Sequence, residues 1–420
     1  MVIPSDTVIQ AIGAQGYAAA LVGIFAFAAF FAAILLGLHD PLRHRHPIRA
    51  VLCVFWLSVL ASYIAMDRST LTVPEAAAAD RLMIQLAVIT GVALVAAECL
   101  TSLHDVRRVL RALTWGGAFC GVVAALQYWI SLDITPYLRE LPGFSINLDS
   151  PAIVDRGSLN RVTGTSITAI ELGVVAGMLL PVAIYLALHD TDRTARRRWA
   201  PVALIALAIP ASVSRSAVVS VVLALGVLVV LMPTRQRLVA LCAAPFAVIA
   251  VFMSAPGVIG TLAAFFGAGS NDDSVKARLH DYPEVERLVD QSPWLGHGGG
   301  TYLPQDPMLI LDNQYLKTAI ELGLVGVVVL AAFFLVPLIS ALVARRRSGD
   351  PELRLLCAAL AGAALAAGAC SFTFDSLSFP MFTNVYALVI GLIGACWRLA
   401  PAGTGSSRAP TAEGRRASIR

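Results

Sequence analysis

The stretch KTAIELGLVGVVVLAAFFLVPLISAL, residues 317–342, decides the fold of this chain. After Glu321 it carries no charged side chain, and about 20 apolar residues in a helix are enough to cross the hydrocarbon core of a bilayer. Three arginines, residues 345–347, follow it, and arginine often marks the cytoplasmic boundary of a span. The stretch therefore predicts a transmembrane helix.

Similar apolar stretches recur along the whole chain, separated by short charged islands. Hydrophobic residues make up 58% of the sequence and charged residues 14%, whereas about a quarter of an average soluble domain is charged. The predicted fold class is an all-α, polytopic transmembrane helical bundle of about eleven spans. The predicted spans are approximately residues 16–38, 48–66, 81–98, 110–130, 167–188, 199–213, 216–232, 238–255, 317–342, 355–371 and 383–399.

Alternate loops are rich in arginine, which predicts the orientation of the chain. Cytoplasmic loops carry the excess of Lys and Arg in membrane proteins. We therefore expect a multi-pass protein of the inner (cytoplasmic) membrane, with its N-terminus outside and its C-terminus inside. No Lys or Arg precedes Arg43, so the first apolar run is expected to stay as a transmembrane helix rather than be cleaved as a signal peptide. The arginine-rich islands are residues 43–49, 107–111, 193–198, 235–237, 345–354 and the tail from Arg398.

The spans are expected to form one polytopic membrane domain over residues 1–400. Two extracytoplasmic loops are long, about residues 131–166 and 256–316, and the second is expected to be partly helical. Loops of this length are usually functional or disordered. Residues 401–420 combine Pro, Gly, Ser and Arg with almost no apolar side chain, which predicts a disordered cytoplasmic tail.

Several classes of function are disfavoured by the composition. The net charge is +4, but no basic stripe alternates with exposed aromatics, so nucleic acid is not an expected partner. The seven cysteines lie in or beside apolar runs without a CxxC pair, so neither disulfides nor metal ligands are expected. Asp190-Thr191-Asp192 matches the DxD pattern of nucleotide-sugar enzymes. It lies among arginines in a short cytoplasmic connection, however, and is more simply interpreted as solvated carboxylates.

One charged residue interrupts the apolar pattern on the outer side. The turn SVSRSA, residues 212–217, places Arg215 between two apolar helices with almost no loop to carry it into water. A guanidinium held at the membrane surface can bind an anion, although helix-end arginines often reach lipid headgroups instead. Arg215 is therefore a candidate site residue with two interpretations.

The large outer loop and the span after it are dense in polar and aromatic residues. Glycines 296 and 298–300 allow a ligand to approach the backbone closely, although glycine clusters are more often simple turns. Asp312 and Asn313 then open a span in which Asp312 shares a helical face with Tyr315 or Leu316. Such a carboxylate can also be a helix cap. The other candidates in this region are Arg278, His280, Arg287, His297, Gly298 and Tyr302.

Together these segments resemble the O-antigen ligase and polymerase superfamily of membrane glycosyltransferases. The resemblance covers roughly residues 165–335. It is carried by SRSA at Arg215, by Arg278, by the turn PWLGHGGGTY and by DNQYLKTAIELGLVG. Many ligases of that family have His-Asn where this chain has Asp312-Asn313, and the histidine is their proposed base.

The resemblance implies transfer of a glycan from a polyprenyl-pyrophosphate carrier to an acceptor hydroxyl outside the membrane. Its donor would be undecaprenyl-pyrophosphate-linked glycan, its acceptor a glycan or lipid, and membrane lipids would surround the protein. Arg215 and Arg278 would neutralise the leaving pyrophosphate, with Arg287 in reserve, and Asp312 would be the base. The reaction would be inverting and would need no metal or other cofactor. Asn313, Tyr302, Tyr315, Gly298, His297 and His280 would contact substrate, and either histidine could replace Asp312 as the base.

The sequence leaves several alternatives open. It does not separate a ligase from a polysaccharide polymerase, because the two share donor chemistry. A transporter or flippase for a lipid-linked glycan is the alternative function, although no matched pair of interrupted helices is apparent. A non-catalytic scaffold is a third interpretation. Glu171 and Asp375 could line the same outer cavity or serve as caps, since both lie near the ends of predicted spans.

Overall fold

The computed structural model describes residues 1–10, 17–41, 45–140, 142–147, 151–156, 159–254, 273–306 and 309–400. The predicted tail 401–420 and residues 255–272 of the predicted large loop lie outside these ranges. The helices are α1 (Ala18–Leu35), α2 (Pro47–Ala65), α3 (Val73–Cys99), α4 (Leu103–Trp129), α5 (Thr135–Arg139), α6 (Ala169–His189), α7 (Ala195–Ala211), α8 (Arg215–Leu231), α9 (Thr234–Ser254), α11 (Asp273–Gln291), α12 (Gln314–Arg347), α13 (Pro351–Cys370), η5 (Ser376–Ser378) and α14 (Pro380–Leu399).

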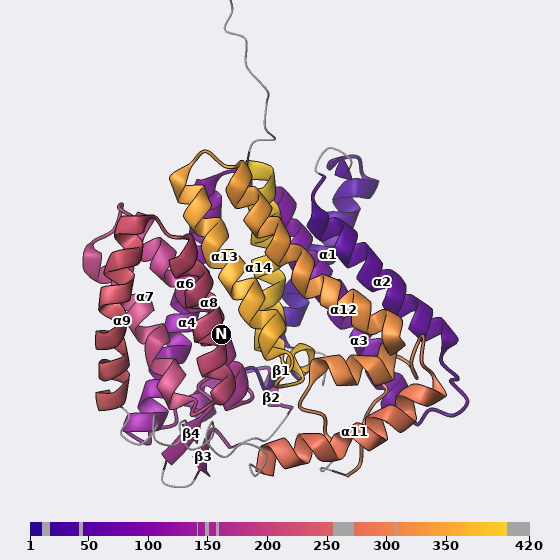
Figure 1. Cartoon of the computed structure of the whole chain (residues 1–420). Helices are drawn as coiled ribbons and strands as arrows, with labels where there is room; N and C mark the ends of the chain where they lie inside the picture. Colours follow the sequence, from indigo (N-terminus) through magenta and orange to yellow (C-terminus); the bar gives the residue numbers. More distant parts are fainter. Residues whose placement is uncertain are drawn as a thin grey trace, which may run out of the picture.

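The long helices run between two ends of a bundle, as Figure 1 shows. Within the described ranges, eight helices are long and apolar enough to cross a membrane: α1, α2, α3, α4, α6, α12, α13 and α14. The shorter apolar helix α8 packs against α6 and α13, and α7 packs against α4 and α6. The all-α polytopic prediction is confirmed, and each predicted span corresponds to one helix.

Several helices begin before the apolar stretch that predicted them. A capping side chain determines where each of these helices starts, and the apolar stretch begins only later. The predicted span at 81–98 belongs to a helix that begins at Val73, where Thr72 and Glu75 form a capping box. The span predicted from residue 110 begins at Leu103, where the Ser102 side chain accepts from the Asp105 N–H.

Two groups of helices meet at α13. Helices α4, α6, α7, α8 and α9 form one group, and α1, α2, α3, α12 and α14 form the other (Figure 1). Small residues let the backbones come close at this junction: a Cβ on Gly362 of α13 would lie 2.3 Å from the Ala224 carbonyl oxygen of α8. Any side chain at Gly362 would force the two groups apart.

The non-spanning elements gather at one end of the bundle, drawn lowest in Figure 1. Strand β1 (Thr7–Ile9) pairs antiparallel with β2 (Phe144–Ile146), and β3 (Ile153–Arg156) pairs with β4 (Leu159–Val162). Helix α11 lies at the same end and packs against the start of α12. The large loop is therefore partly helical, as predicted.

The predicted continuous span 317–342 needs a correction, because α12 is broken at Gly323. Gly323 has φ 67° and ψ −168°, a region that only glycine adopts readily. A Cβ there would lie 2.4 Å from the Trp294 carbonyl carbon. The sequence pattern missed the break because apolar periodicity continues through it.

The glycine-containing turn before α12 satisfies the backbone groups that the break releases. The N–H groups of His297 and Gly298 donate to the carbonyls of Ile320 (2.9 Å) and Glu321 (3.0 Å). On the far side of the break, the Leu324 N–H donates to the Pro293 carbonyl (2.8 Å). Backbone groups at membrane depth must be paired in this way, so the turn and the break form one unit.

Candidate functional site

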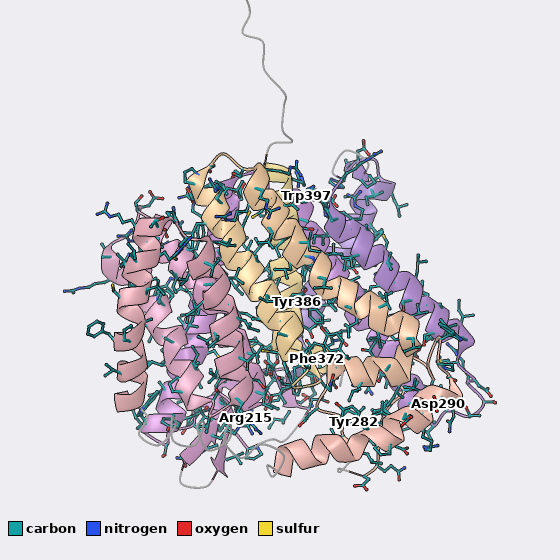
Figure 2. All side chains as sticks on the ribbon, in the orientation of Figure 1. Arg215, Tyr282, Asp290, Phe372, Tyr386 and Trp397 are labelled. Atoms are coloured by element: carbon teal, nitrogen blue, oxygen red, sulfur yellow. The ribbon has the colours of Figure 1, made fainter. Side chains whose placement is uncertain are left out.

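Arg215 is the first residue of α8 and is half-buried. Figure 2 places it near the end of the bundle where α11 lies. The next residue, Ser216, donates from its hydroxyl to Thr373 Oγ1 (2.8 Å), which lies in the segment after α13. The start of α8 is therefore fixed against that segment.

Asp312 lies just outside α12, with an exposed side chain. Its neighbour Asn313 is the N-cap, and the Asn313 Oδ1 accepts from the N–H groups of Tyr315 (2.9 Å) and Leu316 (3.3 Å). The Gln314 N–H donates to the Ser371 carbonyl (2.9 Å). Arg215 and Asp312 thus lie one and two residues, respectively, from side chains or backbone groups that are bonded to the same short segment, 371–373.

An aromatic pair lies on this segment. The rings of Tyr315 and Phe372 stack with centroids 4.0 Å apart and planes at 18°. The Tyr315 hydroxyl donates to the Gly368 carbonyl (3.0 Å), whereas Phe372 is 56% exposed. An exposed aromatic face beside the predicted residues suits the apolar face of a sugar ring. Phe372 was not among the predicted residues, because nothing in SFTFDSLSFP, residues 371–380, distinguishes it from core phenylalanines.

The predicted contacts in the glycine turn are engaged within the protein. Gly298 has φ +118°, and its N–H is bonded to Glu321 at the break. His297 Nε2 lies 2.8 Å from the Leu288 carbonyl of α11, and the Tyr302 hydroxyl donates to the Leu309 carbonyl (2.8 Å). The His297 contact joins α11 to the glycine-containing turn, which is itself bonded to the broken helix. Roles for these residues in substrate binding remain predictions.

Helix α11 carries the three remaining predicted residues. The structure places Arg278 and His280 on this helix, but their side chains lie outside what it describes. Arg287 is exposed, and its Nη2 pairs with Glu284 Oε1 at 2.6 Å. This hydrogen bond lowers the pKa of the Glu284 carboxyl. Arg287 is thus held by its own helix.

A cavity of about 320 Å³ lies between α3, the first half of α12, η5 and α14. Four polar residues of α12 line one side of it: Gln314, Lys317, Thr318 and Glu321. Their spacing of three and four residues puts them on one helical face. That face is opposite Leu316, which packs with Leu311 and Ile320 beside α11. Arg215 and Asp312 are not among the lining residues.

The charged residues of the cavity differ in their partners. Lys317 Nζ lies 2.7 Å from Asp375 Oδ2 and 2.9 Å from Ser378 Oγ. Glu321 is 5% exposed, and its carboxyl group lies near the backbone N–H groups of Gly300 and Tyr302. Within the described ranges, the Glu321 Oε1 atom has no hydrogen-bond partner. The sequence does carry a signal for this site, because the polar residues of α12 that line the cavity are spaced three and four apart. This spacing was not among the predicted features.

Other charged residues that the sequence singled out have structural roles. Glu171 is fully buried, and its carboxylate accepts from the N–H groups of Ile167, Met381 and Phe382 at 2.9–3.1 Å. Glu171 is therefore a cap joining α6 to α14. Asp190 of the DxD sequence forms a bidentate pair with Arg111, with Nε···Oδ2 2.8 Å and Nη2···Oδ1 2.5 Å.

Among the residues that the structure describes, no three His, Cys, Asp or Glu side chains are grouped so that they could hold a metal ion.

Comparison with known protein families gives a match over part of the chain. Residues 200–331 match a family model described as O-antigen ligase, which confirms the resemblance predicted from the sequence. The matched segment runs from α7 to the middle of α12 and includes Arg215, Arg278, Asp312 and the break at Gly323. A search of curated proteins found no significant match.

Proposed function

From the match of residues 200–331 to the O-antigen ligase family, we propose that this protein is a glycosyltransferase of the cytoplasmic membrane. It transfers a glycan from a polyprenyl-pyrophosphate carrier to an acceptor hydroxyl. The acceptor is a glycan or a lipid, as in a polysaccharide polymerase or an O-antigen ligase. The active site faces outward, at the end of the bundle that carries α11.

The observation that best supports this proposal is the shared attachment of Arg215 and Asp312. Arg215 is followed by Ser216, which is bonded to Thr373. Asp312 lies two residues before Gln314, which is bonded to Ser371. A cation and a carboxylate at one bundle end are what transfer from a pyrophosphate donor requires, because charge and a proton must be handled together. Helix α11, which carries Arg278, packs against the same part of α12.

The proposed reaction is a single displacement. The acceptor hydroxyl oxygen attacks the anomeric carbon, and the bond from that carbon to the phosphate oxygen breaks. The hydroxyl proton passes to the Asp312 carboxylate. The released polyprenyl pyrophosphate takes the bonding electron pair, and the guanidinium groups of Arg215 and Arg278 neutralise the added charge. Attack from the opposite face inverts the anomeric centre.

Asp312 is a better candidate for the base than His297. The His297 Nε2 lies 2.8 Å from the Leu288 carbonyl, so this nitrogen acts as a donor there and only Nδ1 is left to take a proton. The Asp312 side chain is exposed, within reach of substrate.

Transfer by purified protein tests the proposal. Wild type, Arg215→Ala and Asp312→Asn, reconstituted in nanodiscs, are given a polyprenyl-pyrophosphate-linked glycan and acceptor. Each variant should lose about a hundredfold or more in rate while keeping its thermal unfolding temperature, because one pre-organised charged group contributes on that order. The matched controls are Arg108→Ala and Asp290→Asn, both exposed and outside the proposed site. Undiminished transfer by both site variants would remove the mechanism.

One observation favours a second function. An interrupted helix is typical of transporters, and α12 is interrupted at Gly323. In the flippase alternative, Arg215 would bind a lipid-linked glycan without chemistry. Vesicles with the donor in one leaflet distinguish the two functions. A flippase moves the donor to the other leaflet without an acceptor. The proposed enzyme removes the glycan from the donor, and only when an acceptor is present.

A further inference from the structure

The cavity beside the first half of α12 is not used by the proposed reaction. Its volume of about 320 Å³ is in the range of small-molecule sites, about 300–1,000 Å³. It lies near the outer end of the bundle, since Asn147 of the loop after β2 and Gly300 of the glycine turn contribute to its wall. It could therefore accept part of a substrate that approaches from that side.

Glu321 indicates that this cavity binds a ligand. The side chain is 5% exposed, yet its Oε1 has no hydrogen-bond partner among the described residues. A buried, unpaired carboxylate oxygen is costly, and such atoms in folded proteins usually mark a missing water, ion or ligand. Glu171, in a similar buried position, has both carboxylate oxygens bonded to backbone N–H groups.

The charges around Glu321 define the class of ligand. Lys317 is paired with Asp375 and is also attracted electrostatically to Glu321. Glu321 lines the cavity with one buried carboxylate oxygen that has no hydrogen-bond partner among the described residues, and the guanidinium of Arg81 lies at the exposed rim. The carboxylate would repel a phosphate placed beside it. A prenyl chain would leave it without a partner. A neutral, hydroxyl-rich group supplies the donor that Oε1 needs.

The rest of the wall suits such a group. The amide side chains of Gln85 and Asn384 line the cavity beside apolar carbons of Phe55 and Leu82. Saccharides present hydroxyl groups around the ring edge and C–H groups on the ring faces, and sites that bind mixed ligands combine apolar walls with a few placed polar groups.

We infer that this cavity is a saccharide-binding subsite in which Glu321 Oε1 accepts a hydrogen bond from a sugar hydroxyl. The inference rests on the proposed function, because the sugar belongs to the glycan donor or to the acceptor. Glu321 is seven residues beyond Gln314, about 10 Å along the helix. The sugar held here is therefore one sugar unit away from the sugar that reacts. Glu321 binds substrate and does not take part in the reaction.

Direct binding tests the subsite without requiring transfer. Saturation-transfer NMR with the protein in nanodiscs measures binding of methyl glycosides of a hexose, an N-acetylhexosamine and a 6-deoxyhexose. At least one should bind wild type, and Glu321→Gln should weaken it about tenfold by removing the charge from the acceptor. Ala20→Phe, which fills the cavity from α1 and leaves Glu321 unchanged, should abolish binding. Glu286→Gln, exposed on α11, is the matched control.

The transfer assay then identifies the source of the sugar. Initial rates are measured against donor at saturating acceptor, and against acceptor at saturating donor. Glu321→Gln should raise KM about tenfold for the substrate that supplies the sugar and leave kcat nearly unchanged. If wild type binds glycosides but transfers nothing, the proposed function fails and the subsite stands. The subsite proposal is overturned if wild type binds none of the glycosides. It is also overturned if Glu321→Gln and Ala20→Phe both bind as tightly as wild type.

Discussion

Two buried glutamates illustrate how residues of the same type serve different purposes. Glu171 is bonded through both oxygens to the backbone of Ile167, Met381 and Phe382, whereas Glu321 lines a cavity and its buried Oε1 has no hydrogen-bond partner among the described residues. The first arrangement stabilises the fold by satisfying helix starts. The arrangement at Glu321 leaves one carboxylate oxygen without a donor, and a ligand can supply that donor. The distinction lies in the neighbours of each residue.

We expect Glu171→Ala to destabilise the protein strongly. The substitution leaves three N–H groups without their acceptor, and each buried unsatisfied group costs about 1–3 kcal/mol. Thermal unfolding in detergent should show a fall of several degrees in the apparent Tm. Glu286→Ala, at an exposed position, should leave Tm unchanged. An unaltered Tm for Glu171→Ala would show that the cap contributes little.

The two aspartates of the DxD sequence should respond differently to substitution. Asp190→Asn removes one charge of a half-buried bidentate pair with Arg111 and should lower Tm. The side chain of Asp192 is 69% exposed, so Asp192→Asn should leave both Tm and transfer unchanged. A nucleotide-sugar site at this sequence would instead require Asp192, and loss of transfer in that variant would point to one.

At the scale of elements, the broken helix α12 connects the proposed site with the proposed subsite. Its first half begins at the Asn313 cap beside Asp312 and ends at Gly323, just past Glu321. The glycine turn fixes this half by bonding to Ile320 and Glu321. Movement of this half of α12 would therefore displace Asp312 and Glu321 together.

Gly323→Ala should disrupt this element. The new Cβ would meet the Trp294 backbone at 2.4 Å, and alanine disfavours the backbone angles of Gly323 by about 1–3 kcal/mol. We expect a lower Tm and reduced transfer. The matched control is Gly226→Ala in the interior of α8, where a Cβ would meet no atom within 4 Å and should stabilise by up to about 1 kcal/mol. Equal Tm changes in the two variants would contradict a constrained break.

At the scale of the whole molecule, the arginine-rich segments lie at the end of the bundle opposite α11. Arg345, Arg346 and Arg347 end α12, and Arg398 is in the last turn of α14. Both helices end at the top of Figure 1. The orientation in which that end faces the cytoplasm stays a prediction.

Cysteine labelling tests the orientation. In a variant whose seven native cysteines are replaced, Ser69→Cys and Gly349→Cys place single thiols in exposed turns at opposite ends. A membrane-impermeant maleimide should label Ser69→Cys in intact cells and Gly349→Cys only after permeabilisation. The reverse pattern would place the proposed active site in the cytoplasm. Thermal unfolding checks that each variant folds.

Much of the fold could be predicted from the sequence, because a bilayer imposes length and apolarity on each span separately. The predicted stretches correspond to helices, and the family resemblance came from local motifs such as SRSA and DNQYLKTAIELGLVG. The cavity could not be predicted in this way. Its wall combines α3, α12 and α14, and no local pattern specifies which faces of these helices meet.

The sequence TAIELG separates what is local from what is tertiary, since it occurs twice, at residues 168–173 and 318–323. By itself the sequence determined that both copies form apolar helix, because intrinsic propensity and hydropathy are the same in each. Only the tertiary structure decided that the helix continues through Gly173 and breaks at Gly323. At Gly323 the turn 293–298 supplies backbone partners for the groups that a break exposes, and at membrane depth a helix can open only where such partners are present.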